Sequence, residues 1–468
     1  MVSISREPVA LISDKFLSFT VDMAQVVGRD WWHPDTRRIW SLTGANHTEP
    51  FDFSRKRLRN MAKNLAPAFL KIGGTKSDDV FYAVDSKNPG KDYGSVLTMD
   101  MWGSINDFAK ECGLDLFFSI NAGKGPRKNK QWTGDNAREF LEYSKEKGYE
   151  IPVFGFGNEP NGYIIKGLNW FVSGRQYARD VIKVRELIDE LYPGSRLAAG
   201  SSSFWPYLGE FFPVMRQFLK NNTSKVDIVA WHHYPQQSSR IPFATRRAKP
   251  FLLLDPKKLD AVSRWAAKVE SWKEKYSPSS ALWLAETGHA QAGGEPGLSD
   301  TFVSGFWWLD QLGLLAKKGQ EVVVRQTLSG AHYGLIDDES LDPNPDYWNS
   351  VLWKMLMGTK VYDAESKEDI RCYAHSARDE KSIVLLLLNL DKEYSKKIDL
   401  GNTLPKEVFM LSSDDLFGRN VFLNGKLLRI SEDGTLPDLL PVETTEESIE
   451  LKPTSYAFIR FLKNTSPE

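Results

Sequence analysis

Two glutamates in short motifs are the clearest sign of chemistry in this chain. Glu159 stands in Gly157-Asn158-Glu159-Pro160, and Glu286 stands in Leu284-Ala285-Glu286-Thr287. Each follows an apolar run, where a carboxylate is costly to hold unless it is paired or used. Paired carboxylates across a cavity perform glycoside hydrolysis, in which one protonates the leaving oxygen and the other attacks the anomeric carbon or activates water. The sequence therefore predicts a glycoside hydrolase, and the alternative is that both glutamates belong to structural ion pairs.

Polar residues near these motifs suit supporting roles. Asn158 is placed to bind a sugar 2-hydroxyl, an interaction that strengthens in the transition state. Tyr234 can donate a hydrogen bond to Glu286 and keep it ionised, or it can simply pack at the mouth of the site. His232 and His233 invite a metal site, but adjacent strand residues point to opposite faces. We therefore expect His232 to be a hydrogen-bonding partner in the active site, and we expect neither a metal nor a cofactor.

Two loops carry a local excess of positive charge. Residues 121–131 hold four Lys or Arg and residues 235–250, which include Arg240, hold four more, with no acid in either loop. The whole chain has a net charge of −1, which argues against a nucleic-acid partner. A local imbalance favours a polyanion or an acidic sugar, and the alternative is a solvated basic face. Four tryptophans could also stack on sugar rings, namely Trp31, Trp32, Trp132 and Trp205.

The elements that position these residues alternate between short apolar runs and longer stretches of helical period. Strands are predicted at 17–22, 68–73, 114–121, 151–158, 196–200, 226–232, 281–286 and 321–327. Helices are predicted at 54–65, 101–112, 135–147, 174–191, 207–221, 256–276 and 300–318. This order predicts an α/β fold, a (β/α)8 barrel whose reactive groups lie at the carboxyl ends of the strands. A doubly wound sheet is the rival, but neither GxGxxG nor a P-loop follows the first strand.

From about residue 360 the pattern becomes alternating strands separated by turns such as Asn424-Gly425. It predicts a C-terminal β-sandwich domain, to which an N-terminal strand at 8–12 adds. The predicted domains are a catalytic barrel at 12–355 and a sandwich formed by 1–11 and 356–468, within a chain of 468 residues.

The remaining composition sets limits on class and location. Two cysteines, Cys112 and Cys372, exclude a disulfide scaffold. No apolar run reaches the length of a membrane span, so no membrane partner is expected. The first 13 residues lack a signal-peptide core. We expect a monomer that is either secreted or periplasmic, with its signal peptide absent from this chain, or cytoplasmic.

Several motifs together resemble one family. The two glutamate motifs look like the acid/base and nucleophile motifs of the heparanase-like enzymes, glycoside hydrolase family 79. The likeness continues through Phe69-Leu70-Lys71-Ile72-Gly73-Gly74-Thr75-Lys76, Trp231-His232-His233-Tyr234, Val324-Arg325-Gln326 and Asp342-Pro343-Asn344-Pro345-Asp346-Tyr347-Trp348. It covers nearly the whole chain and supports a barrel joined to a β-sandwich.

The resemblance implies a role for each matching residue. Glu159 is similar to the general acid/base of the family and Glu286 to its nucleophile. Asp22, Thr75 and Asn158 match positions that hold the hydroxyls of glucuronic acid, while Gly293, followed by Gly294, and Tyr333 match the capture of its carboxylate. The predicted substrate-binding set is Asp22, Thr75, Asn158, Lys166, His232, Tyr234, Arg240, Gly293, Gly294, Gln326 and Tyr333.

The activity implied is that of a retaining β-glucuronidase, most simply an endo-β-D-glucuronidase acting on heparan sulfate or heparin-like glycosaminoglycans. The alternatives are an exo-acting β-glucuronidase and an endo-glucuronidase of hyaluronan. A non-enzymatic carbohydrate-binding protein is disfavoured because both glutamates are present. The segment that processed heparanases excise is replaced by a short loop at 84–98, which resembles a single-chain, bacterial-type enzyme. The arginine pair that heparanases carry after the fifth strand is replaced by Ser201-Ser202-Ser203, which leaves sulfate recognition to the basic loops.

Overall fold

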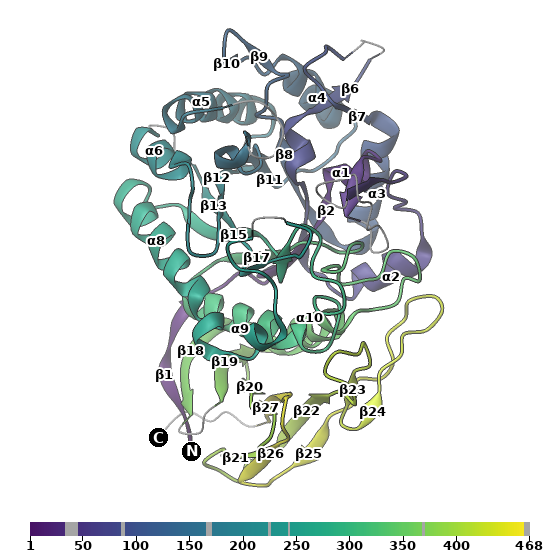
Figure 1. Cartoon of the computed structure of the whole chain (residues 1–468), viewed down its shortest axis with the longest axis vertical. Coiled ribbons are helices and arrows are strands. Elements are labelled where there is room, and N and C mark those ends of the chain that lie inside the picture. The colour runs from purple at the N-terminus through teal and green to yellow at the C-terminus, as the bar shows by residue number, and fades with distance from the viewer. Residues whose placement is uncertain are drawn as a thin grey trace.

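The computed structural model describes residues 1–32, 45–85, 89–164, 171–222, 226–241, 244–366 and 370–462. Eight parallel strands close into a barrel, which occupies the upper part of Figure 1. In barrel order they are β2 (Leu17–Asp22), β5 (Ala68–Gly73), β8 (Leu114–Ile120), β11 (Val153–Phe156), β12 (Arg196–Phe204), β13 (Ile228–His233), β15 (Ala281–Thr287) and β17 (Val322–Arg325). The predicted (β/α)8 barrel is confirmed.

Every second side chain of each barrel strand points inward and fills the barrel interior. Phe69, Phe117, Ile228, Trp283 and Val322 belong to one buried cluster in this interior. Because side chains alternate across a strand, the next inward positions toward the carboxyl ends become the floor of the mouth. Apolar packing therefore fills the lower barrel, and polar side chains gather at the top.

Helices surround the barrel, and three of them differ from the prediction. The main ones are α2 (Lys56–Lys63), α3 (Met99–Cys112), α4 (Asp135–Glu146), α5 (Gly174–Leu191), α6 (Val214–Asn221), α7 (Pro256–Leu259), α8 (Ala261–Tyr276), α9 (Ser304–Lys317) and α10 (Pro345–Leu356). The helix predicted at 207–221 begins only at Val214, because Pro213 precedes it and Gly209 has a φ of +68°. The helix predicted at 256–276 is two helices, and α10 was not predicted. Among the described residues, no helix has both the length and the hydropathy needed to cross a bilayer.

Short helices and short strands lie in the loops that follow the carboxyl ends of the barrel strands. They are α1 (Met23–Val26), η1 (Thr75–Asp78), η2 (Pro160–Gly162), η3 (Pro250–Leu253), β3 (Asp30–Trp32), β4 (Ala45–His47), β6 (Val80–Ala83), β7 (Ser95–Thr98), β9 (Arg127–Lys128), β10 (Gln131–Trp132), β14 (Gln236–Gln237) and β16 (Ala290–Gln291). Within the segment 84–98, residues 86–88 lie outside the described residues. Three of these elements, α1, η1 and η2, begin within a few residues of the ends of β2, β5 and β11 and therefore lie at the mouth.

The C-terminal region is an antiparallel sheet of nine strands below the barrel in Figure 1. Its strands are β1 (Val2–Leu11), β18 (Met357–Ser366), β19 (Arg371–Ala377), β20 (Ile383–Asn389), β27 (Ser455–Phe461), β22 (Lys406–Ser412), β23 (Phe422–Leu423), β24 (Lys426–Leu427) and, off the main path, β25 (Val442–Thr444). The N-terminal strand pairs antiparallel with β18, as expected. The predicted domain boundaries stay a prediction.

Each face of this sheet is covered by a different layer. On the barrel side, Tyr456 stacks on Phe302 and Tyr373 donates a hydrogen bond to Asp310 on α9. On the other face, Ile398 of β21 (Lys396–Asp399) and Leu451 of β26 (Ser448–Leu451) join a buried cluster with the sheet. The second layer of the predicted sandwich is thus a two-stranded sheet.

Candidate active site

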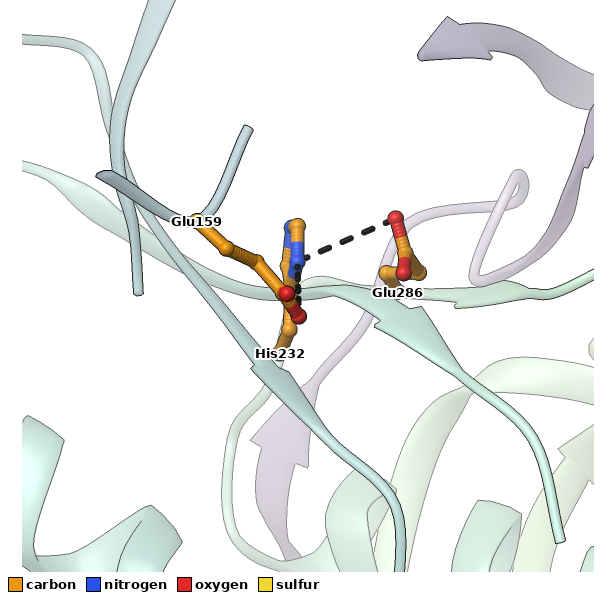
Figure 2. A group of neighbouring side chains, drawn as sticks. All are labelled: Glu159, His232 and Glu286. Atoms are coloured by element: carbon orange, nitrogen blue, oxygen red, sulfur yellow. Dashed lines mark hydrogen bonds and ion pairs between the residues drawn. The ribbon is translucent and has the colours of Figure 1, made fainter. Parts of the chain in front are cut away.

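The two glutamates meet at the mouth of the barrel. A carboxylate oxygen of Glu159, a carboxylate oxygen of Glu286 and a ring nitrogen of His232 all lie within 4.8 Å of one another. Figure 2 shows the imidazole of His232 beside both carboxylates, with Nδ1 3.2 Å from Oε1 of Glu159 and 3.8 Å from Oε2 of Glu286. All three side chains are buried. The residues are 73 and 54 positions apart in the chain, so only the closure of the barrel brings them together.

Glu159 is held by a constrained backbone. Gly157 and Glu159 have φ values of +69° and +50°, and for a glutamate this left-handed conformation is strained. The strain is compensated because the amide of Glu159 donates to the carbonyl of Ser201 at 3.0 Å, and the amide of Asn158 donates to Oδ2 of Asp78 at 2.7 Å. Asp78 is a buried residue of η1 that the sequence did not single out. Strain of this kind is retained where it aims a functional side chain.

Glu286 has a hydrogen-bonding partner on each side. The phenol of Tyr234 donates to Oε1 at 2.9 Å, which is the bond expected from the sequence. The ammonium of Lys71 lies 3.3 Å from Oε2, and it also donates to the carbonyl of Ala285 at 2.9 Å. Burial lowers the pKa of Lys71, and the negative charge of Glu286 opposes that effect. These contacts fix the orientation of the Glu286 carboxylate and place a cation beside it.

Lys71 is a site residue that sequence reasoning missed. It lies in the middle of β5 and is 2% exposed. Lysine is almost never fully buried unless it is paired, so a lysine inside a run predicted to be buried on both faces was the available signal. Its partner Glu286 is 215 residues away, which no local pattern reveals.

A second polar cluster forms beside Glu286. Asp22, at the end of β2, accepts hydrogen bonds from the amide of Ala24 and from Nε2 of Gln326, both at 2.9 Å. Burial, reinforced by the charge of Glu286, raises the pKa of Asp22 to about 7. A Cβ on Gly74 would stand 2.0 Å from Oδ2 of Asp22, so only glycine allows this approach. The next residue, Thr75, begins η1 at the same place.

The predicted carboxylate-binding residues also lie together. The carbonyl of Gly293 accepts a hydrogen bond from the amide of His332 at 2.8 Å, next to Tyr333. Arg240 donates to the carbonyl of Gly294 at 2.9 Å. Tyr333 is buried, with its ring centroid 6.3 Å from that of Tyr234, and burial raises its phenol pKa well above the usual value. Arg240 therefore lies against the loop of Gly293 and Gly294, and its positive charge interacts electrostatically with the phenol of Tyr333.

Part of the predicted basic surface is neutralised. In loop 121–131, Lys124 pairs with Asp92, Arg127 pairs with Asp180 and Lys128 pairs with Asp135. The acidic partners come from other segments of the chain. The lack of acids within the loop therefore did not mean that its positive charges are unpaired. Trp132 is buried in the core, whereas Trp31, which is also buried, packs edge-on against the ring of Tyr333 beside the site. Lys166 lies outside the described residues.

The cluster of Glu159, His232 and Glu286 has the donor types of a metal site. However, Nε2 of His232 lies 3.4 Å from Nζ of Lys71, which also contacts Glu286. A metal ion would share these two residues with an ammonium group within a few ångströms, and like charges at that distance repel. The arrangement suits two carboxylates that handle protons and a sugar carbon better than it suits a cation site.

The chain is similar to known glycoside hydrolases in sequence and in fold. The model for "Glycosyl hydrolase family 79, N-terminal domain" matches residues 5–313. The chain is 30% identical to a heparanase of Bos taurus, over 97% of this chain and 89% of the relative. It is 29% identical to a baicalin-beta-D-glucuronidase of Scutellaria baicalensis, over 98% and 91%. Among solved structures, a 4-O-alpha-L-rhamnosyl-beta-D-glucuronidase from Fusarium oxysporum 12S superposes with a TM-score of 0.69 at 16% identity, covering 98% of both chains, which shows a shared fold.

Proposed function

The chain belongs to glycosyl hydrolase family 79 and is a glycoside hydrolase, and from this premise we propose that it is a retaining β-glucuronidase. Glu159 is the acid/base and Glu286 is the nucleophile. The observation that carries the proposal is the closeness of their carboxylates, with one oxygen of each within 4.8 Å. Retaining enzymes hold their carboxyl groups about 5–5.5 Å apart, whereas inverting enzymes need about 6.5–9.5 Å to admit a water molecule.

In the first step Glu286 attacks C1 of the glucuronic acid and forms a covalent ester, while Glu159 gives its proton to the departing glycosidic oxygen. Tyr234 and Lys71 orient the carboxylate of Glu286 and stabilise its negative charge before the attack. In the second step Glu159 takes a proton from water, which attacks C1 and releases Glu286. His232 contacts both carboxylates and is suited to hold them at a fixed separation.

The residues around the glutamates support glucuronic acid as the sugar. Asp22, Gln326 and Asn158 present oxygen and amide groups for the hydroxyls. Gly293, Gly294 and Tyr333, with Arg240 behind them, suit the negatively charged carboxylate at C6. A relative whose name specifies β-D-glucuronidase activity accords with this choice.

For the larger substrate we propose glucuronic acid linkages in heparan sulfate or heparin-like chains, since a heparanase is among the relatives. The second candidate is exo-action on single glucuronides. Loop 121–131 favours it, because three of its four cations are paired with carboxylates and so do not make a continuous basic track for an anionic polymer.

The test uses nitrophenyl β-glucuronide and follows the first-formed product by NMR. β-Glucuronic acid before mutarotation supports retention, and the α-anomer contradicts it. Glu286→Gln and Glu159→Gln are both expected to lose activity on poorly activated substrates by at least about 100-fold. Sizing the products from heparan sulfate and from hyaluronan separates internal cleavage from release of single sugars. We expect a chelator to leave the rate unchanged, and a chelator-sensitive rate would contradict the mechanism.

A further inference from the structure

The segment that carries the acid/base is held by hydrogen bonds to three different neighbours. The amides of residues 157–159 donate in turn to the carbonyl of Ile120 at 2.9 Å, to Oδ2 of Asp78 at 2.7 Å and to the carbonyl of Ser201 at 3.0 Å. Of these three acceptors only Asp78 is a side chain, since the other two are backbone carbonyls. Asp78 is therefore the acceptor among them that a change of residue type can remove.

Asp78 joins the loops that follow three neighbouring strands of the barrel. It belongs to η1, which follows β5, and β8 lies between β5 and β11 in the barrel order. Its Oδ1 accepts a hydrogen bond from the amide of Ala122 after β8 at 2.9 Å, and its Oδ2 accepts that of Asn158 after β11. Hydrogen bonds to a carboxylate are about twice as strong as those between neutral groups. The carboxylate of Asp78 thus bridges the ends of three strands.

The surroundings leave this bridge little room to adjust. Asp78 is 1% exposed. A Cβ on Gly123 would stand 1.8 Å from the carbonyl oxygen of Asp78, so the loop after β8 can pass this close only with glycine there. A Cβ on Gly157, whose φ is +69°, would stand 2.8 Å from the Cβ of Ala122. Groups packed this closely hold one another at fixed positions.

The chain after Glu159 is anchored independently of Asp78. Asn161 makes two hydrogen bonds with the backbone of Ser203, each of 2.9 Å, and these fix it to β12. If Asp78 is replaced, the chain before Glu159 loses its side-chain anchor while the chain after it stays attached. The strained φ of +50° at Glu159 favours relaxation of the backbone at that point. Such a rotation moves the carboxyl group, which must lie within hydrogen-bond distance of the glycosidic oxygen to protonate it.

We propose that Asp78 is a positioning residue for the acid/base, because its carboxylate bridges the amides of Ala122 and Asn158 and so holds Glu159 in place for proton transfer. This inference rests on the proposed retaining β-glucuronidase function. Glu286 lies on β15, away from β5, β8 and β11, so its attack on C1 does not depend on the bridge. Loss of the bridge should therefore slow the reaction only as far as the reaction needs Glu159.

The experiment compares wild type with Asp78→Asn on 2,4-dinitrophenyl, phenyl and methyl β-D-glucuronide. Dinitrophenolate departs without help from an acid, phenolate needs some help and methoxide needs the most. The variant replaces one acceptor oxygen by an amide group that only donates, so one backbone amide loses its partner. We expect kcat/KM to fall about 10- to 100-fold for the methyl substrate, less for the phenyl substrate and less than about twofold for the dinitrophenyl substrate.

Azide gives a second readout, which reports the base step. Glu159 must take a proton from the water that attacks the glycosyl-enzyme, whereas azide needs no base. Azide attacks C1, the bond from C1 to the Glu286 carboxylate breaks with its electron pair kept by Glu286, and β-glucuronyl azide is released. We expect azide to raise kcat of Asp78→Asn on the dinitrophenyl substrate by up to about tenfold and to leave the wild-type kcat unchanged.

Asp180→Asn is the matched control, because Asp180 is also a buried carboxylate that accepts a backbone amide near the barrel mouth. Its partners lie outside the segment 157–159 and are Arg127, Trp132 and Gln176. This variant should have a lower Tm, and any loss of kcat/KM should be equal for the three substrates.

Asp78→Glu keeps the charge and both acceptor oxygens but is one methylene longer, so it carries the same comparison if Asp78→Asn does not fold. We expect it to show the same order of losses across the three substrates. A fully active Asp78→Glu, an equal loss on all three substrates in Asp78→Asn, or a kcat that azide does not raise overturns this inference alone. Failure of the wild-type enzyme to hydrolyse any of the three glucuronides overturns the proposed function itself.

Discussion

The two halves of the barrel mouth solve different binding problems. The half formed after β15, β17, β2 and β5 is polar and buried, and its side chains bind one another before any sugar arrives, as Asp22 and Gln326 do. The half formed after β11 and β12 presents exposed aromatic rings. These rings contact one another by aromatic packing and not by hydrogen bonds. We call them the polar half and the aromatic half.

The difference concerns directionality. Hydrogen bonds to a sugar hydroxyl or carboxylate demand exact positions, and a preorganised network supplies them without reorganisation during the reaction. Stacking is tolerant of the ring that it meets. The polar half is thus suited to directional hydrogen bonds, whereas the aromatic half is suited to contacts that tolerate different rings. The predictions below test whether the polar half behaves as one rigid network.

The largest effect is expected from Lys71→Met. Removing one partner of a buried charge pair costs about 3–5 kcal/mol, because the other charge is left in a medium that solvates it poorly. We expect kcat/KM to fall roughly 100- to 1000-fold for every glucuronide, and the acid limb of the pH–rate profile to move to higher pH. Lys76→Met, which breaks a more exposed ion pair between Lys76 in η1 and Asp79 just after it, is the control. If the Lys71→Met enzyme hydrolyses glucuronides at a normal rate, the polar half does not depend on its buried cation. The contrast between the two halves would then be wrong.

Gly74→Ala should follow in size. The new Cβ would lie 2.0 Å from the carboxylate of Asp22, at a φ of +95° that alanine disfavours. A displacement of about 1 Å at a reacting centre can cost 100-fold, so we expect kcat/KM to drop roughly 10- to 100-fold together with a lower Tm. Gly90→Ala is the control because a Cβ there meets nothing within 4 Å. Equal activity of the two variants would show that Asp22 has room to move.

Asp22→Asn should change the pH dependence of stability. The pKa of Asp22 is about 7 in the folded protein and about 3.9 in an unfolded chain. Between these values the folded state binds more protons, so this group makes the wild-type protein less stable as pH rises. The variant lacks that penalty. The difference in unfolding free energy, variant minus wild type, should therefore grow by about 2 kcal/mol from pH 5 to pH 7, as measured by urea titration. A difference that shrinks over this range would contradict the assignment.

The smallest effect is expected from Arg419→Met. Arg419, in a loop of the sheet domain, pairs with Asp300 and lies 3.1 Å from Oδ2 of Asp337. Asp300 in turn contacts His332, the residue that precedes Tyr333. Arg419 is about half exposed, so the loss of its ion pairs costs about 0.2–1 kcal/mol, and we expect KM for glucuronides to rise by a factor of about 1.4 to 5 with little change in kcat.

Arg460→Met is the matched control for Arg419→Met, since Arg460 pairs with Asp379 and Glu407 inside the sheet domain. It should leave KM unchanged. An equal rise in KM for both variants would mean that general loosening of the sheet domain, and not the contact with Asp300, moves the polar half.

Sequence patterns predicted the barrel well because its strands are local and apolar on both faces. The strands at 17–22 and 68–73 are found with those bounds. Helix α10 was not predicted, and all of its residues except Met355 are buried, between the barrel and the sheet. The loop at 207–213 was predicted to belong to the helix at 207–221, whereas Tyr207, Leu208 and Phe211 in it are exposed and no helix begins before Val214.

The site was predictable in its reactive groups and less so in their support. Glu159, Glu286 and Tyr234 follow strands, and the rule that barrel chemistry lies at strand ends locates them. Lys71 and Asp78 act on partners 215 and 80 residues away, and such contacts exist only once the barrel closes. The same distance in sequence hid the acids that neutralise loop 121–131, so the local count of charges overstated its positive field.

The pairing of β1 with β18 has a consequence for how the chain is made. Strand β1 precedes the barrel in the chain and its partner lies at residues 357–366, so it waits until the whole barrel has been synthesised. Until then its backbone groups are open to water, and in the finished protein it covers the edge of β18. A protein trimmed of residues 1–11 would leave that edge bare as a template for strands of neighbouring molecules, and would be expected to aggregate even with its catalytic barrel whole.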